Sequence, residues 1–146
     1  MPERETLERA KEDAREGKSP STQAGEFVRE EIHHVREGKH GARSPQQAIA
    51  IGLSKARRAG VKLAAPKGPA SVRKKAEQDE RAAKKGPARK TSVTRSRAVE
   101  GALQRESHSA ASHAALSRQA KRSAAKRSKT SRQKAAAKAA RTRKAA

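Results

Sequence analysis

The sequence contains no cysteine, tryptophan or tyrosine and has a single aromatic ring, that of Phe27. Without cysteine there is no disulfide framework, no thiolate nucleophile and no thiolate zinc site, so cysteine usage says nothing about the redox compartment. No apolar run approaches the roughly 18 residues of a membrane span, and residues 1–16 lack the apolar stretch of a signal peptide. We therefore expect a cytoplasmic protein with no membrane partner.

Large apolar residues are scarce. Leu, Ile, Val and Phe together occupy 15 of 146 positions, well below the roughly one-fifth level under which highly charged chains usually stay disordered. Too little apolar surface is present for the core of an ordinary compact enzyme. The chain also has no Gly-rich phosphate loop and no nucleophile elbow. We therefore expect no enzyme activity, catalytic residue, cofactor or small-molecule substrate.

Charge divides the chain into two parts. Residues 1–64 carry 13 basic and 10 acidic side chains, a net charge of +3, whereas residues 65–146 carry 24 and 5, a net charge of +19. No acidic residue follows Glu106. Nine of the fifteen large apolar residues lie between Phe27 and Leu63, so folding is expected to be centred in the first part.

Three helices are predicted in this first part. Residues 2–16 begin with Pro2 and early glutamates and end at Gly17. A second helix from Ser19 or Ser21 to Glu37 carries apolar residues at spacings of three and four. The third helix has the start signal Ser44, Pro45 and Gln47, and ends in cations before Gly60. Gly52 on this helix would allow a close helix crossing, and Glu30 and Glu31 are expected on a solvated face.

The sequence thus predicts an all-α protein: a small three-helix, helix-turn-helix-like module over residues 1–63, followed by a largely disordered basic tail rich in Ala, Lys, Arg and Ser. The two prolines of LAAPKGPA indicate a linker at 64–70. Residues 71–106 are expected to be marginally helical, with a break at Gly86 and Pro87. Residues 107–146 are expected to be a disordered polycation, because their like charges repel and no apolar stripe supports a helix.

The basic residues point to nucleic acid as the partner. A basic third helix can lie against phosphates or enter a groove, although helix dipoles alone favour cations at this end. A flexible polycation gains affinity by counterion release whatever the sequence. Because aromatic rings for stacking on unpaired bases are missing, duplex DNA is favoured over single strands. The predicted contact residues are Lys39, Arg43, Lys55, Arg57, Arg58 and Lys62 in the module, and Arg118, Lys121, Arg122, Lys126, Arg127, Lys129, Arg132, Lys134, Lys138, Arg141, Arg143 and Lys144 in the tail.

Two other functions remain open. The chain could be an adaptor whose second helix docks a protein while the tail tethers it to polyanions, or a protein that binds ribosomal or other structured RNA. The module's small core suggests that self-association, as in a homo-oligomer, or DNA binding contributes to its stability. Metal binding is not expected. Adjacent His33 and His34 cannot both face one site, no cysteine assists them, and His108 and His113 lie in the tail.

Residues 21–63 contain the elements KHGARS and QAIAIGLSKARRAG. This stretch resembles a family of small basic bacterial proteins of unknown function to which DNA binding is ascribed. The tail is similar in composition alone to the C-terminal tails of linker histones and bacterial histone-like proteins, but no winged-helix pattern with strands precedes it. The resemblance implies a histone-like, nucleoid-associated DNA-binding protein of low sequence specificity, and it adds no catalytic residue.

Overall fold

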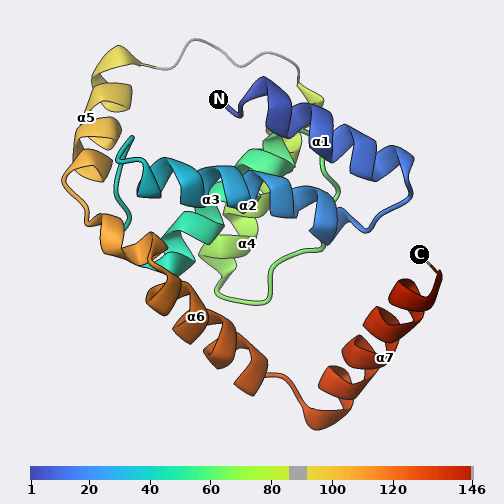
Figure 1. The fold of residues 1–146 in the computed structure, drawn as a ribbon. Coiled ribbons are helices and arrows are strands. Elements are labelled where there is room, and N and C mark those ends of the chain that lie inside the picture. Colours follow the sequence, from blue (N-terminus) through green and yellow to red (C-terminus); the bar gives the residue numbers. More distant parts are fainter. Residues whose placement is uncertain (86–91, 146) are drawn as a thin grey trace. The chain divides into compact units, whose positions relative to one another are not determined.

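The computed structural model describes residues 1–85 and 92–145, and within these ranges all regular secondary structure is helical (Figure 1). The all-α prediction is confirmed for this part of the chain. Contacts group the chain into two units, Met1–Ser112 and His113–Ala146. The first unit holds α1 (Arg4–Arg15), α2 (Pro20–Arg36), α3 (Pro45–Arg58), α4 (Ala70–Lys84), α5 (Val93–Gln104) and the short 3-10 helix η1 (His108–Ala111). The second unit holds α6 (His113–Ala125) and α7 (Lys129–Ala145).

The three predicted helices form close to their expected bounds because serines cap the starts of α2 and α3 and a glycine follows each of the three helices. The Ser44 hydroxyl accepts from the Gln47 N–H at 3.3 Å, and the Gln47 side chain reaches back to accept from the Arg43 N–H at 2.7 Å. At the start of α2 the Ser19 hydroxyl accepts from the Thr22 N–H at 3.4 Å. Gly17, Gly38 and Gly60 follow the three helices with φ values of 70°, 74° and 95°, a left-handed conformation that favours glycine.

Small residues build the core between these helices. Ala10, Ala24, Phe27 and Ala56 form one buried cluster, against which Leu7, Leu53, Val61 and Leu63 pack. A Cβ added at Gly52 would stand 2.7 Å from Val28 Cα, so the prediction of a close helix crossing at Gly52 is confirmed. Alanine and glycine therefore compensate for the scarcity of large side chains by letting α2 and α3 approach closely.

The first unit extends beyond residue 63, where the sequence placed the end of the module. Helix α4 packs against α3, and its buried Asp79 accepts from the Ser54 hydroxyl at 2.5 Å. Further along, the N–H groups of Gly41 and Ala42 donate to the carbonyls of Leu103 and Ser107 at 2.8 and 3.0 Å. These contacts anchor segments whose own large apolar residues, such as Val72 and Val99, remain exposed. The break predicted at Gly86 and Pro87 lies outside the described residues.

The prediction of a disordered tail is wrong for the described residues, because 108–111, 113–125 and 129–145 are helical. Alanine supplies 14 of the 40 residues from 107 to 146, and it has the highest intrinsic helix propensity of the twenty amino acids. The Ser128 hydroxyl also accepts from the Ser131 N–H at 3.2 Å at the start of α7. Local propensity and capping therefore outweigh the repulsion between cations such as Lys134 and Lys138, one turn apart.

Candidate nucleic-acid interface and the buried Lys55 cluster

Lys55, a predicted phosphate contact, faces the interior of the first unit. Its Nζ lies 3.2 Å from Glu30 Oε1 and 2.6 Å from Glu31 Oε2, and its side chain is only 16% exposed. The short contact with Glu31 is an ion pair whose angles do not make a hydrogen bond. Because both partners are carboxylates, the positive charge of Lys55 is compensated inside the protein.

Glu30 and Glu31 were expected on a solvated face of α2, and this prediction is wrong. Their side chains are 2% and 1% exposed. Although adjacent residues project in different directions from a helix, α3 supplies one ammonium group that both carboxylates reach. Burying a carboxylate is costly without such partners. The surface that an adaptor was expected to use on α2 is therefore partly buried in the fold.

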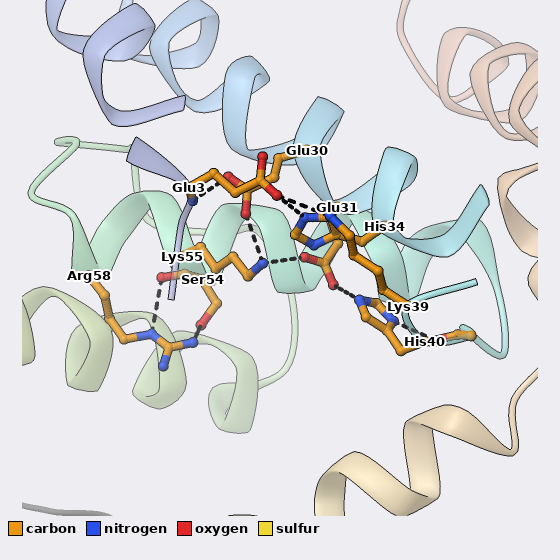
Figure 2. Close-up of polar contacts among 10 residues, drawn as sticks. Glu3, Glu30, Glu31, His34, Lys39, His40, Ser54, Lys55 and Arg58 are labelled. Atoms are coloured by element: carbon orange, nitrogen blue, oxygen red, sulfur yellow. Dashed lines mark hydrogen bonds and ion pairs between the residues drawn. The ribbon is translucent and has the colours of Figure 1, made fainter. Parts of the chain in front are cut away.

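More polar groups surround these three residues. Figure 2 shows Glu3, His34, Lys39 and His40 beside Glu30, Glu31 and Lys55, and the Thr6 side chain donates to Glu30. We call the whole set the Lys55 cluster: Glu3, Thr6, Glu30, Glu31, His34, Lys39, His40 and Lys55. Glu3 Oε1 lies 2.9 Å from His34 Nε2 and 3.1 Å from Lys39 Nζ. The Glu3 N–H donates to Glu30 Oε2 at 3.1 Å. These contacts fix the start of α1 to α2.

His40 connects the loop after α2 to the same cluster. Its Nε2 lies 3.0 Å from Glu31 Oε1, and its Nδ1 lies 3.0 Å from the carbonyl oxygen of Gly41. His34 and His40 lie edge to face, with ring centroids 6.2 Å apart. One ligand atom from each of Glu31, His34 and His40 falls within 4.8 Å of the other two, so a carboxylate and two imidazoles converge here.

Electrostatics in the cluster favours the charged forms of Glu3, Glu30 and Lys39. The hydrogen bond from His34 and then that from Lys39 lower the pKa of Glu3 to about 2. Burial opposes ionisation of Glu30, but donors from Thr6, Glu3 and Lys55 outweigh it and hold its pKa below the ordinary value. The carboxylates of Glu3 and Glu37 raise the pKa of Lys39.

The other residues of the module that were predicted to contact phosphate differ in exposure and in whether they pair with acids. Arg57 is 8% exposed, donates to the Ala64 carbonyl at 3.4 Å, and has a buried Nε without a hydrogen-bond partner among the described residues. Arg58 pairs with Asp79 at 3.4 Å and Arg43 with Glu106 at 3.4 Å. Lys62 is exposed. The basic block of α3 is therefore largely committed to contacts within the first unit.

The tail cations are arranged differently. All twelve predicted tail residues are exposed, on α6, on α7 and in the turn between them. The nearest acidic residue in sequence, Glu106, belongs to the other unit. About 3.6 residues per turn place Lys134, Lys138 and Arg141 on one side of α7, and Lys129, Arg132 and Arg143 on the opposite side. Positive charge therefore surrounds α7 instead of forming one stripe.

Sequence reasoning missed the grouping of Glu31, His34 and His40. Adjacent His33 and His34 were considered from the sequence, but the structure brings together a different set of residues. Glu31 and His34 are three residues apart and therefore share a helix face. The Glu-x-x-His spacing on α2 was a usable signal, whereas the approach of His40 depends on the turn at Gly38 and the packing of the loop.

None of the helices in the described ranges has a stretch long and apolar enough to cross a membrane. Comparisons with protein-family models, with curated proteins and with solved structures find no match for this chain. The resemblance of residues 21–63 to small basic bacterial proteins therefore stays a prediction, and the functional argument depends on the residues and their surroundings.

Proposed function

We propose that this chain binds duplex DNA with low sequence specificity, as a nucleoid-associated, histone-like protein of the bacterial cytoplasm. The observation that carries the proposal is the exposure of all twelve cations of the second unit, with no acid in the same unit. Duplex DNA carries one negative charge per roughly 1.7 Å of its axis, and each phosphate neutralised by a lysine or arginine releases condensed counterions.

The two units contribute unequally to this binding. In the module, Lys55 and Arg57 are directed inward, while Lys39, Arg43 and Arg58 already pair with acids. Each of these paired cations must give up a contact before it meets a phosphate. The cations of α6 and α7 have no acid of their own unit to leave, so they supply most of the affinity.

Low specificity follows from the same side chains. Lysine and arginine distributed all round α7 meet phosphates whichever way the helix turns, and phosphate contacts carry no sequence information. Asparagine is absent from the chain, and the tail has no aromatic side chain. Bidentate readout of adenine by asparagine and stacking on unpaired bases are therefore both missing from the tail.

Two matched variants of the full chain test this proposal. The tail variant replaces Arg132, Lys134, Lys138 and Arg141 with Gln, and the module variant replaces Lys39, Arg43, Arg58 and Lys62 with Gln. Both remove four positive charges, and Gln retains good helix propensity. Affinity for duplex DNA is titrated between low and physiological salt, with circular dichroism to verify that helix content is unchanged.

We expect the tail variant to lower the salt slope by up to about 3 to 4 log units per tenfold change in salt, and the module variant to lower it much less. Random and chosen duplexes should be affected equally. A larger loss in the module variant would instead indicate binding through the α3 face. Preference for structured RNA over DNA of the same length would overturn the assignment of DNA as the partner.

A further inference from the structure

We infer that Glu31, His34 and His40 bind a structural divalent cation of the zinc class, with Glu3 as the neighbouring carboxylate that completes the site. This site is independent of nucleic-acid binding. It lies where the start of α1, the C-terminal half of α2 and the loop after α2 meet (Figure 2). The donor set of two imidazoles and one or two carboxylates is one that Zn²⁺ accepts.

The contacts of His40 carry the argument. A neutral imidazole has one N–H and one lone pair. The Nδ1 atom of His40 faces the Gly41 carbonyl at 3.0 Å, and its Nε2 faces Glu31 Oε1 at 3.0 Å. Both facing atoms are acceptors, so with a single proton one of the two contacts sets lone pair against lone pair. A positive species between Nε2 and the carboxylate removes this repulsion, and a metal ion satisfies both lone pairs at once.

The arrangement around His40 also matches that of a metal-bound histidine. Metal-ligating histidines usually donate their other ring N–H to a carbonyl or carboxylate, which fixes the tautomer. For His40 that acceptor is the Gly41 carbonyl, which leaves Nε2 as the donor to metal. On Glu31, Lys55 contacts Oε2 and leaves Oε1 to the ion. His40 and Glu31 therefore each have an outer partner already in place.

Donor spacing in the cluster is close to that of a zinc shell. Ligands about 2.0–2.1 Å from zinc in a tetrahedral site lie roughly 3.3 Å from one another. Glu31 Oε1 and His40 Nε2 are 3.0 Å apart, and Glu3 Oε1 and His34 Nε2 are 2.9 Å apart. The three converging donors of Glu31, His34 and His40 lie within 4.8 Å of each other. Small side-chain rotations therefore suffice to close them on one ion.

The local charge favours a dication. Four carboxylates contact two ammonium groups here: Glu3, Glu30, Glu31 and Glu37 face Lys39 and Lys55. With neutral histidines, two negative charges among these groups are therefore uncompensated. A surface cavity of about 170 Å³ borders the site at Glu3, Glu30 and His34, and it is also lined by Arg9 and Arg29. An ion here would join three segments of a unit whose apolar core is small.

The experiment uses the full chain with His108→Gln and His113→Gln as the starting protein, so that His33, His34 and His40 are its remaining histidines. After treatment with a chelator, zinc is titrated by calorimetry and thermal unfolding is followed with and without zinc. The variants are His34→Gln and His40→Gln. The matched control is His33→Gln, which removes the same group from an exposed position on the same helix.

We expect one zinc per chain, at least ~10-fold weaker binding in each of the His34 and His40 variants, and unchanged binding in the His33 control. The rise in melting temperature caused by zinc should be lost in the same two variants. In the starting protein, the ring-nitrogen NMR signals of His34 and His40 should shift on zinc addition while those of His33 stay in place. This measurement needs only the starting protein, so it holds even if the His34 or His40 variant fails to fold.

Three results would overturn the inference. The first is binding no tighter than about 1 mM in the starting protein, and the second is an equal loss of affinity in the His33 control. The third is a set of His40 signals typical of a doubly protonated ring that zinc does not change. In that case a second proton, and not a metal, separates His40 from Glu31.

Discussion

Lys55 Nζ lies 2.6 Å from Oε2 of Glu31, a residue in the C-terminal half of α2 whose side chain is 1% exposed. The same ammonium group lies 3.2 Å from Glu30, so a single lysine of α3 contacts two buried acids. Two adjacent acids in the interior of so small a core are tolerated because this lysine reaches both.

Replacing Lys55 with Met should strongly destabilise the protein. The substitution keeps most of the side-chain volume but leaves Glu30 and Glu31 buried without their common partner. We expect a loss of about 3–5 kcal/mol in the free energy of unfolding, measured by urea denaturation of the full chain. Lys62→Met at an exposed position is the control and should change stability by less than about 0.5 kcal/mol. Adding Glu30→Gln and Glu31→Gln to Lys55→Met should recover part of the loss, and a failure to recover any would contradict a charge-based cause.

Gly52→Ala should force α2 and α3 apart. The added Cβ would stand 2.7 Å from Val28 Cα and 3.0 Å from the Phe27 carbonyl oxygen, and backbone atoms cannot move aside cheaply. We expect destabilisation of about 1–3 kcal/mol. The control is Gly25→Ala on α2, where an added Cβ meets nothing within 4 Å. That change should stabilise the helix by about 0.5–1 kcal/mol. Thermal unfolding should therefore show a lower melting temperature for Gly52→Ala and a higher one for Gly25→Ala.

Gly41→Ala should release the segment after α5 from the loop after α2. An added Cβ would overlap the backbone carbonyl of Glu106. The hydrogen bonds from Gly41 to Leu103 and from Ala42 to Ser107 would then break. We expect faster amide hydrogen exchange at Ala42, with exchange in α1 unchanged. Gly68→Ala, in open space, is the control; equal protection in both variants would show that the loop contact is not needed.

The two sides of α7 should contribute equally to DNA binding. One variant replaces Lys134, Lys138 and Arg141 with Gln, and the other replaces Lys129, Arg132 and Arg143. Each removes three cations from one side of the helix, so each should lower the salt slope by up to about 3 log units per tenfold change in salt. If one variant alone accounted for the loss, α7 would have a defined binding face, and binding independent of helix orientation would be ruled out.

Local chemistry explains why the helices could be predicted. Ser19, Ser44 and the glycines at 17, 38 and 60 act through bonds and dihedral angles within a few residues, and the apolar spacing of α2 identified Phe27 as a core residue, which is 1% exposed. Gly52 could be predicted as a crossing point because only a missing side chain permits such an approach. These features need no knowledge of what lies across the fold.

The sequence by itself determined the all-helical class, the position of the first three helices and the separation of a mixed-charge part from a polycation. Only the tertiary structure decided which charged side chains are exposed and which are paired inside the protein. Glu30, Glu31 and Lys55 look like surface residues in the sequence, since charged groups usually are. The two acids are buried and Lys55 is mostly covered because α2 and α3 cross where one ammonium group meets both acids. The convergence of His40 on Glu31 and His34 was decided in the same way, by a turn and a loop contact with residues about sixty positions away. The sequence specifies which residues are charged, but the fold determines which charged groups come into contact.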